Sequence, residues 1–182
     1  LVLQADAGRG RDTLAPLLSR EVGKPRAGAR IEVLSMMNTF EAYAGMADNV
    51  RGRAVSNATA DALGMVLKEP VGVAGLIIPW NWPLALLSWK LGAALAAGCT
   101  AVVKPSIYTG ATTYEVARIF SEAGVPAGVI NIISGKSSEI GEKLVTHESV
   151  DKISFTGSTA TGRRIMELAA GTPAVGLAAA AS

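Results

Sequence analysis

The stretch Val71-Gly-Val-Ala-Gly-Leu-Ile-Ile-Pro-Trp-Asn81 decides the fold class of this chain. Its first eight residues are apolar or glycine, which is typical of a strand buried on both faces of a sheet. Pro79-Trp-Asn81 then ends the strand. A side-chain amide at such a strand end can donate to charge that develops on a carbonyl oxygen. Asn81 is therefore a candidate oxyanion donor, and the alternative is an ordinary turn asparagine.

Working outward from this stretch, buried strands alternate with helices beyond Pro70. Strands joined through helices indicate a parallel sheet with helices on both faces, a Rossmann-like α/β fold. Ligands of such sheets bind beyond the carboxyl ends of the strands, and Asn81, Lys104, Gly135 and Gly157 all follow a strand. The predicted strands are 73–78, 101–103, 129–133 and 152–155, and the predicted helices are 84–97, 111–122, 139–146 and 159–170.

Upstream of the strand, apolar residues recur at spacings of three and four, which predicts amphipathic helices over 12–22 and 29–49. Residues 1–51 are thus interpreted as a helical lead-in and residues 52–69 as a hairpin-like excursion. Residues 70–182 form the alternating core of what we expect to be one NAD(P)-binding domain, a fragment of a longer protein.

Composition narrows the functional classes. The chain has 182 residues, 49% of them hydrophobic, and a net charge of +2 without long charge runs. The charge pattern therefore does not indicate binding to nucleic acid or to an anionic membrane surface. The apolar stretch from Trp82 to Val103 is interrupted by Lys90, which argues against a membrane-spanning helix. With only Cys99 and His147, neither a disulfide framework nor a metal site is expected, which fits a cytoplasmic protein.

Two segments carry candidate ligand-binding residues. Lys104 in Val102-Val-Lys-Pro-Ser106 leaves a buried strand, where its ammonium can reach hydroxyls or phosphates, or alternatively extend to solvent. Phe155-Thr-Gly-Ser158 ends a strand and opens a helix, whose free N–H groups and dipole suit an anion. Ser158 alternatively serves only as an N-cap.

Other residues have mainly structural interpretations. Gly135 and Gly141 bracket a helix start and are alternatively turn glycines. Gly135-Lys-Ser137 is similar to the end of a phosphate-binding loop, but Ile130 stands where that motif requires its leading glycine. The segment that begins at Gly8 does not match the dinucleotide fingerprint either, because Thr13 takes the place of its third glycine. Cys99 is interpreted as a packing residue, and Lys90 as a helix-surface or partner-paired lysine.

Taken in order, six segments resemble the aldehyde dehydrogenase superfamily over about Leu17 to Gly171. They are Glu69-Pro-Val-Gly72, Pro79-Trp-Asn81, Trp89-Lys90, Lys104-Pro-Ser106, Glu122-Ala-Gly-Val-Pro126 and Phe155-Thr-Gly-Ser158. The resemblance implies the amino-terminal half of a region that binds NAD or NADP without the usual glycine fingerprint, and an aldehyde as substrate. It also implies a homo-oligomer, because the excursion over 52–69 is similar to the family's subunit-contact hairpin.

The resemblance further implies roles for single residues. Asn81 would be the oxyanion donor and Lys90 an auxiliary catalytic lysine. Lys104 would lie toward the adenosine ribose, Gly157 and Ser158 near the pyrophosphate, and Gly135 and Gly141 near adenine. The cofactor-binding set implied in this way is Ile78, Pro79, Trp80, Asn81, Lys104, Ser106, Ile107, Gly135, Gly141, Phe155, Thr156, Gly157, Ser158 and Thr161.

Departures from the family pattern limit what the chain is expected to do. Ile107 stands where many NAD-preferring members have a glutamate, so NADP is expected to be tolerated as well as NAD. The final residues from Gly176 replace the family's Glu-Leu-Gly-Gly-Lys region, and Cys99 does not match its nucleophile. We therefore expect the isolated chain not to oxidise aldehydes, and a noncatalytic nucleotide-binding or oligomerisation module is the alternative.

Overall fold

Strand β3 (Val73–Ile77) lies at the centre of a five-stranded parallel sheet with the order β5-β4-β3-β6-β7. The other strands are β4 (Thr100–Lys104), β5 (Ile130–Ile132), β6 (Lys152–Gly157) and β7 (Gly176–Ala181). This computed structural model describes the backbone of residues 7–56, 61–172 and 176–181. Successive strands move outward from β3 to β5 and then cross to its other side, so the strand order reverses between β3 and β6.

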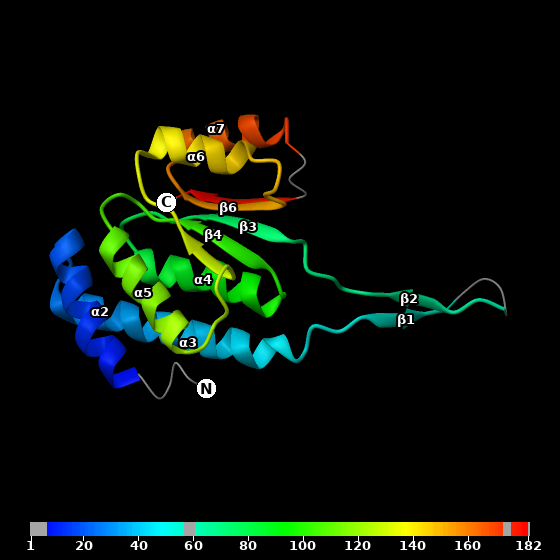
Figure 1. Ribbon diagram of the computed structural model, residues 1–182, viewed down its shortest axis with the longest axis horizontal. Helices are drawn as coiled ribbons and strands as arrows, with labels where there is room; N and C mark the ends of the chain where they lie inside the picture. The colour runs from blue at the N-terminus through cyan, green and yellow to red at the C-terminus, as the bar shows by residue number, and fades with distance from the viewer. Residues whose placement is uncertain (1–6, 57–60, 173–175, 182) are drawn as a thin grey trace.

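Helices cover both faces of the sheet (Figure 1). Helices α4 (Pro83–Ala96) and α5 (Gly110–Glu122) pack on one face, and α6 (Ser137–Thr146) and α7 (Thr159–Ala169) on the other. The predicted Rossmann-like α/β fold is confirmed, with boundaries that differ from the predicted ones by a few residues.

Alternating side chains of the strands divide the interior into two cores. In β3, Ala74 and Leu76 join the larger core beneath α4 and α5, whereas Val73 and Ile77 pack against the smaller core beneath α6 and α7. Gly75 faces the second core as well, because a Cβ there would lie 2.7 Å from Ile153 Cδ1. The continuous apolar run around β3 is thus explained by burial on both faces.

Two amphipathic helices precede the sheet, as predicted. They are α2 (Ala7–Val22) and α3 (Arg26–Ala47), and Gly23 between them adopts a φ of +68°, which favours glycine. Their apolar faces belong to the larger core beside α4 and α5. Helix α3 approaches α4 closely, since a Cβ on Gly92 would lie 2.6 Å from Tyr43 Cδ2.

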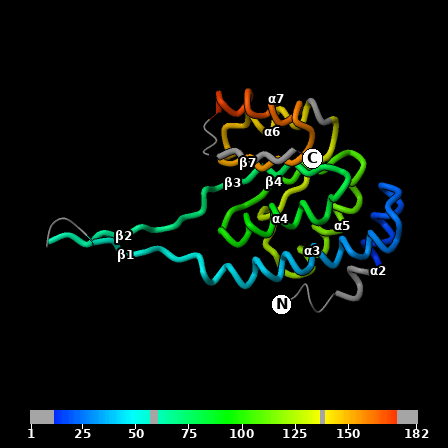
Figure 2. The backbone as a smooth tube through the Cα atoms, turned by 180° about the vertical axis from the view of Figure 1, so that it is seen from behind, coloured from blue at the N-terminus to red at the C-terminus, as the bar shows by residue number. Residues whose placement is uncertain are grey.

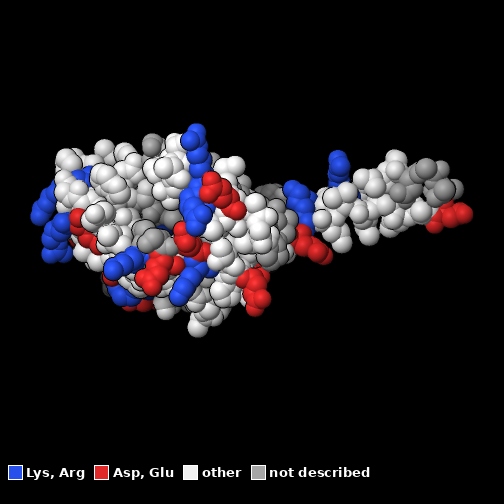
Figure 3. All heavy atoms as spheres, turned by 90° about the horizontal axis from the view of Figure 1, so that it is seen from above, with Lys and Arg blue, Asp and Glu red and all other residues white. Residues whose placement is uncertain are grey.

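Residues 52–56 and 61–69 form an excursion that extends away from the body (Figures 1 and 2). Strands β1 (Arg53–Val55) and β2 (Gly64–Val66) pair antiparallel, with Ala54 opposite Met65. The excursion includes the charged residues Arg53, Asp61, Lys68 and Glu69, and acidic and basic side chains are interspersed on the body (Figure 3). Its large apolar side chains are exposed, among them Leu63 at 78%, Met65 at 61% and Leu67 at 68%.

Strand β7 was not predicted from the sequence. Its alanine-rich segment has high helix propensity, yet it pairs in parallel with β6, from Lys152 opposite Gly176 to Gly157 opposite Ala181. The unpaired backbone edge of β6 outweighs local propensity, because strand formation depends strongly on its neighbours. The apolar stretch from Trp82 to Val103 is helix α4 followed by β4, and no helix in the described ranges is long and apolar enough to cross a bilayer.

Candidate functional site

A groove opens at the carboxyl edge of the sheet, where the chain leaves β3 and β6. Its cavity volume is about 420 Å³. The first helix after β3 packs on one face and the first helix after β6 on the other, so the connections diverge and leave a crevice between them. The strand order itself therefore creates the place for a ligand.

Most of the predicted cofactor-binding residues line this groove. Three segments meet there, one after β3, one after β4 and one from β6 into α7. Gly141 of α6 also lines the groove. The predicted residues in the lining are Ile78, Pro79, Trp80, Lys104, Ser106, Gly141, Phe155, Thr156, Gly157, Ser158 and Thr161.

The junction between β6 and α7 combines a cap with a packed aromatic ring. Ser158 is the N-cap of α7, and its Oγ accepts a hydrogen bond from the N–H of Thr161 at 3.3 Å. The N-cap interpretation is therefore correct, and the same residue also lines the groove. Gly157 is required for space, since a Cβ there would lie 2.6 Å from Cζ of the buried Phe155 ring.

Carboxylates from the lead-in helices already occupy the amino ends of α4 and α5. Glu32 of α3 accepts from Leu84 N–H at 2.8 Å, and Glu21 of α2 accepts from Ala111 N–H and Thr112 N–H, both at 2.8 Å. These helix ends are thereby neutralised. Helix α7 has no acidic residue in its first turn, so its amino end remains suited to an anion in the groove.

Lys104 lies at the carboxyl end of β4 with only 2% of its surface exposed. Burial lowers the pKa of its ammonium below the usual lysine value. Its Nζ donates to the carbonyl of Pro105 at 3.3 Å, and a Cβ on Gly141 would lie 3.8 Å from its Cε. Lys104 thus lies in the groove wall, and the alternative that it extends into solvent is wrong.

Asn81 lies in the turn between β3 and α4 and is half-buried. Its Oδ1 accepts from the N–H of Trp82 at 3.1 Å, and within the described residues no acceptor is paired with its Nδ2. The turn role and the donor role are therefore compatible, because the turn uses the carbonyl oxygen of the side chain and leaves its amide group to donate.

Several predicted residues are not brought into the groove. Asn81, Ile107 and Gly135 are absent from its lining as far as the described residues define it. Ile107 is 55% exposed on the loop after β4. Gly135 has a φ of +156°, and a Cβ there would meet the side chain of Ile140, which supports its interpretation as a turn glycine.

Lys90 points to the face of β6 that α4 covers. Its Nζ donates to Ser154 Oγ at 3.1 Å, so it is a partner-paired, half-buried lysine. Like Asn81, it is not part of the groove lining formed by described residues. Cys99 is buried at the start of β4, the opposite end of that strand from Lys104.

Several groove residues on the helices were not predicted from the sequence. Arg164, Ile165 and Leu168 of α7 follow Thr161 at helical spacing, and this periodicity could have identified them. Arg164 Nε donates to Glu142 Oε1 at 3.1 Å, which links α7 to α6 beside the groove. Both side chains are about half exposed, so this pair contributes little to stability, about 0–1 kcal/mol.

Burial of Lys90 predicts a specific pH dependence of stability. Burial lowers the pKa of its ammonium, so between that lowered value and about 10.4 the unfolded chain binds this proton while the folded chain does not. The free energy of unfolding should then rise with pH across this window. Lys90→Met should reduce the rise, as measured by urea unfolding at several pH values.

A matched variant separates charge from packing. Lys90→Arg keeps a cation that does not deprotonate in this range, so it should also lose the alkaline rise while staying less stable than Lys90→Met. An undiminished rise in both variants would refute the assignment to Lys90.

Within the described parts of the chain, no three histidine, cysteine, aspartate or glutamate side chains are grouped so that they could hold a metal ion. The groove instead offers a helix amino end, a buried ammonium and apolar walls. This donor set fits an elongated molecule with an anionic centre.

Comparisons with known proteins agree on one family. Residues 5–179 match the sequence model of the aldehyde dehydrogenase family. The chain is 42% identical over 163 residues to betaine aldehyde dehydrogenase of Bacillus subtilis, covering 90% of this chain and 33% of that protein. It is 46% identical over 158 residues to aminoacetaldehyde dehydrogenase of Pseudomonas aeruginosa, covering 86% and 32%.

Solved structures show the same likeness. The crystal structure of betaine aldehyde dehydrogenase from Staphylococcus aureus in complex with NAD+ superposes with a TM-score of 0.93 and 38% identity. That superposition covers 98% of this chain and 35% of the other. The chain thus spans about a third of the length of the relatives it matches.

Proposed function

Because the chain belongs to the aldehyde dehydrogenase family, we propose that it forms the part of an NAD(P)-dependent aldehyde dehydrogenase that binds the dinucleotide and stabilises charge on the substrate oxygen. The observation that carries this proposal is the groove at the carboxyl edge of the sheet. It gathers residues from three loops and two helices that lie far apart in the sequence, as one elongated ligand requires.

Each part of the groove has a role in this proposal. The amino end of α7, with Gly157 and Ser158, holds the pyrophosphate. Lys104 donates to the ribose hydroxyls from the groove wall, and Gly141 with the α7 side chains forms the adenine site. Ile78, Pro79 and Trp80 lead from this site toward the turn that carries Asn81.

Asn81 supplies the oxyanion donor. When a nucleophile adds to the aldehyde carbon, negative charge develops on the carbonyl oxygen. A dinucleotide held in the groove would supply the hydride acceptor. The Oδ1 of Asn81 already accepts a hydrogen bond from the N–H of Trp82, which holds the side chain in place. Its Nδ2 can therefore donate with little reorganisation. A preorganised donor of this kind contributes about 3 to 4 kcal/mol to transition-state stabilisation.

Cys99 is not the nucleophile in this proposal. It is the only cysteine of the sequence, and it lies buried before β4, whereas the groove lies at the other end of that strand. At about 3.3 Å of rise per residue, β4 separates the thiol from the groove by well over hydrogen-bond reach. These 182 residues alone are therefore expected to bind cofactor without oxidising aldehydes.

We propose that both NAD and NADP are accepted. Ile107 follows Ser106 of the groove lining and cannot repel a ribose phosphate. It also cannot accept a hydrogen bond from a ribose hydroxyl. The side chain at this position therefore gives no preference for either cofactor.

We also propose that the excursion over residues 52–69 mediates self-association. Its strands expose Met65 and Val66, and Leu63 and Leu67 flank them. Exposed apolar side chains on an extended hairpin favour burial against a second subunit. A second copy of the chain is the proposed partner.

Titration with NADH or NADPH tests the proposed cofactor site. We expect saturable quenching of tryptophan fluorescence, since Trp80 lines the groove and is 54% exposed. Ser158→Asp should weaken binding about tenfold or more, because its carboxylate repels a pyrophosphate at the amino end of α7. Aspartate is also a good N-cap, so α7 should stay intact.

The matched control is Ser149→Asp, which adds the same charge on an exposed loop before β6, at the opposite edge of the sheet. It should leave the affinity unchanged. Equal affinities of wild type and Ser158→Asp, or no saturable signal with either cofactor, would refute the proposed site.

A further inference from the structure

One buried carboxylate lies outside the groove. Glu32 of α3 is fully buried, and its Oε1 accepts from the N–H groups of Leu84 at 2.8 Å and Ala85 at 3.4 Å. Helix α4 has no acidic residue in its first turn, and its N-cap Trp82 makes no side-chain cap bond to any described residue. Glu32 therefore supplies from another helix the cap that the sequence of α4 lacks.

Lys24 connects this carboxylate to the turn before α4. Its Nζ forms an ion pair with Glu32 Oε2 and donates to the backbone carbonyl of Asn81 at 2.8 Å. The same Nζ lies 4.1 Å from the ring centroid of Trp82. One ammonium thus contacts Asn81, its neighbour in the turn, and the carboxylate that caps the next helix.

We propose that Lys24 and Glu32 are positioning residues that fix Asn81 and Trp82 within the turn over residues 80–82 and hence the carboxamide of Asn81. This inference rests on the proposed role of Asn81 as the oxyanion donor. Two bonds hold that residue: Lys24 binds its backbone carbonyl, and its own Oδ1 accepts from Trp82 N–H. With both bonds in place, the Nδ2 group has a defined direction, as preorganised stabilisation requires.

If Lys24 and Glu32 only stabilised the start of α4, the position of Asn81 would not depend on them. Glu21 provides the comparison, because it caps α5 from α2 in the same way and contacts Ala111 and Thr112 instead of the turn over residues 80–82. Loss of either cap should weaken the fold, but only loss of the pair formed by Lys24 and Glu32 should move Asn81.

The test follows the side-chain amide signal of Asn81 by NMR in the full chain with isotope-labelled asparagine, assigned through its loss in Asn81→Ala. Lys24→Met should shift or broaden this signal, because the Asn81 carbonyl loses its donor. Lys24→Met combined with Glu32→Gln should do the same. This double variant leaves no unpaired charge in the core and keeps an amide oxygen to cap α4, so it should fold even where the single variant does not. Glu21→Gln should leave the signal in place.

A cofactor titration separates this inference from the proposed function. Lys24 and Glu32 contact Asn81, Trp82 and the first residues of α4, none of which lines the groove, so the double variant should bind NADPH within about twofold of wild type. Failure of wild type to bind NADPH would refute the cofactor site and not the positioning role. An Asn81 signal that is unchanged in the double variant, or that moves as far in Glu21→Gln, would overturn the positioning role.

Discussion

Asn81→Ala is expected to lower kcat about a hundredfold to a thousandfold, the usual effect of removing one oxyanion donor. The measurement uses a chimera in which this chain replaces the matching third of the Bacillus subtilis relative, which is 42% identical to it. Because the donor acts mainly on charge that develops in the transition state, KM for the aldehyde should change little.

The control for this variant is Asn38→Ala. Asn38 is an exposed asparagine on α3, away from the turn over residues 80–82, and its loss should leave kcat unchanged. A kcat for Asn81→Ala within about threefold of the parent chimera would refute the oxyanion role. Unchanged binding of NADPH by the variant would show that the groove is intact.

Phe155→Ala is expected to lower the free energy of unfolding by about 3 to 5 kcal/mol, the cost of deleting a buried aromatic ring. The ring is 4% exposed and packs beneath Gly157 and Gly162, at the start of α7. Since the same ring supports the amino end of α7, cofactor affinity should fall as well. Urea unfolding followed by circular dichroism measures the first effect, and NADPH titration the second.

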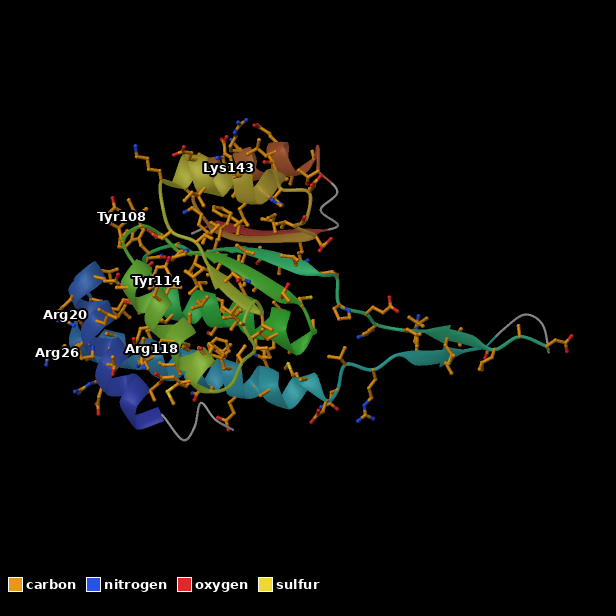
Figure 4. The ribbon with its side chains drawn as sticks, in the orientation of Figure 1. Arg20, Arg26, Tyr108, Tyr114, Arg118 and Lys143 are labelled. Carbon is orange, nitrogen blue, oxygen red and sulfur yellow. The ribbon has the colours of Figure 1, made fainter. Side chains whose placement is uncertain are left out.

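Tyr108→Ala is the matched control, because Tyr108 is an aromatic residue that is 61% exposed on the loop between β4 and α5 (Figure 4). It should change stability by less than about 0.5 kcal/mol. A loss below about 1 kcal/mol for Phe155→Ala would show that the ring does not support this junction.

Much of the fold could be predicted from local patterns. Buried strands alternate with helices from Val73 onward, and apolar spacing identified both lead-in helices. Strand β7 could not be found in this way, because alanine favours a helix and only the free edge of β6 makes the segment a strand.

The candidate site was predictable where its residues follow a strand. Lys104, Gly157 and Ser158 come at such ends, and the parallel sheet brings these ends to one edge. Whether Arg164 and Leu168 line the groove depends on which face of α7 is turned toward it, so the positions of the strand ends could not predict them. Ile107 and Gly135 follow strands too, yet the described structure leaves them outside the groove lining.

The sequence by itself determined the class of this protein, its parallel sheet and the segments that carry polar groups at strand ends, because these features depend on periodicity and on neighbours along the chain. Only the tertiary structure decided that Glu21 and Glu32 cap α5 and α4, and that Lys24 reaches the carbonyl of Asn81. The physical reason is that a helix end needs a carboxylate nearby in space, and nothing in the local sequence specifies which distant residue will supply it.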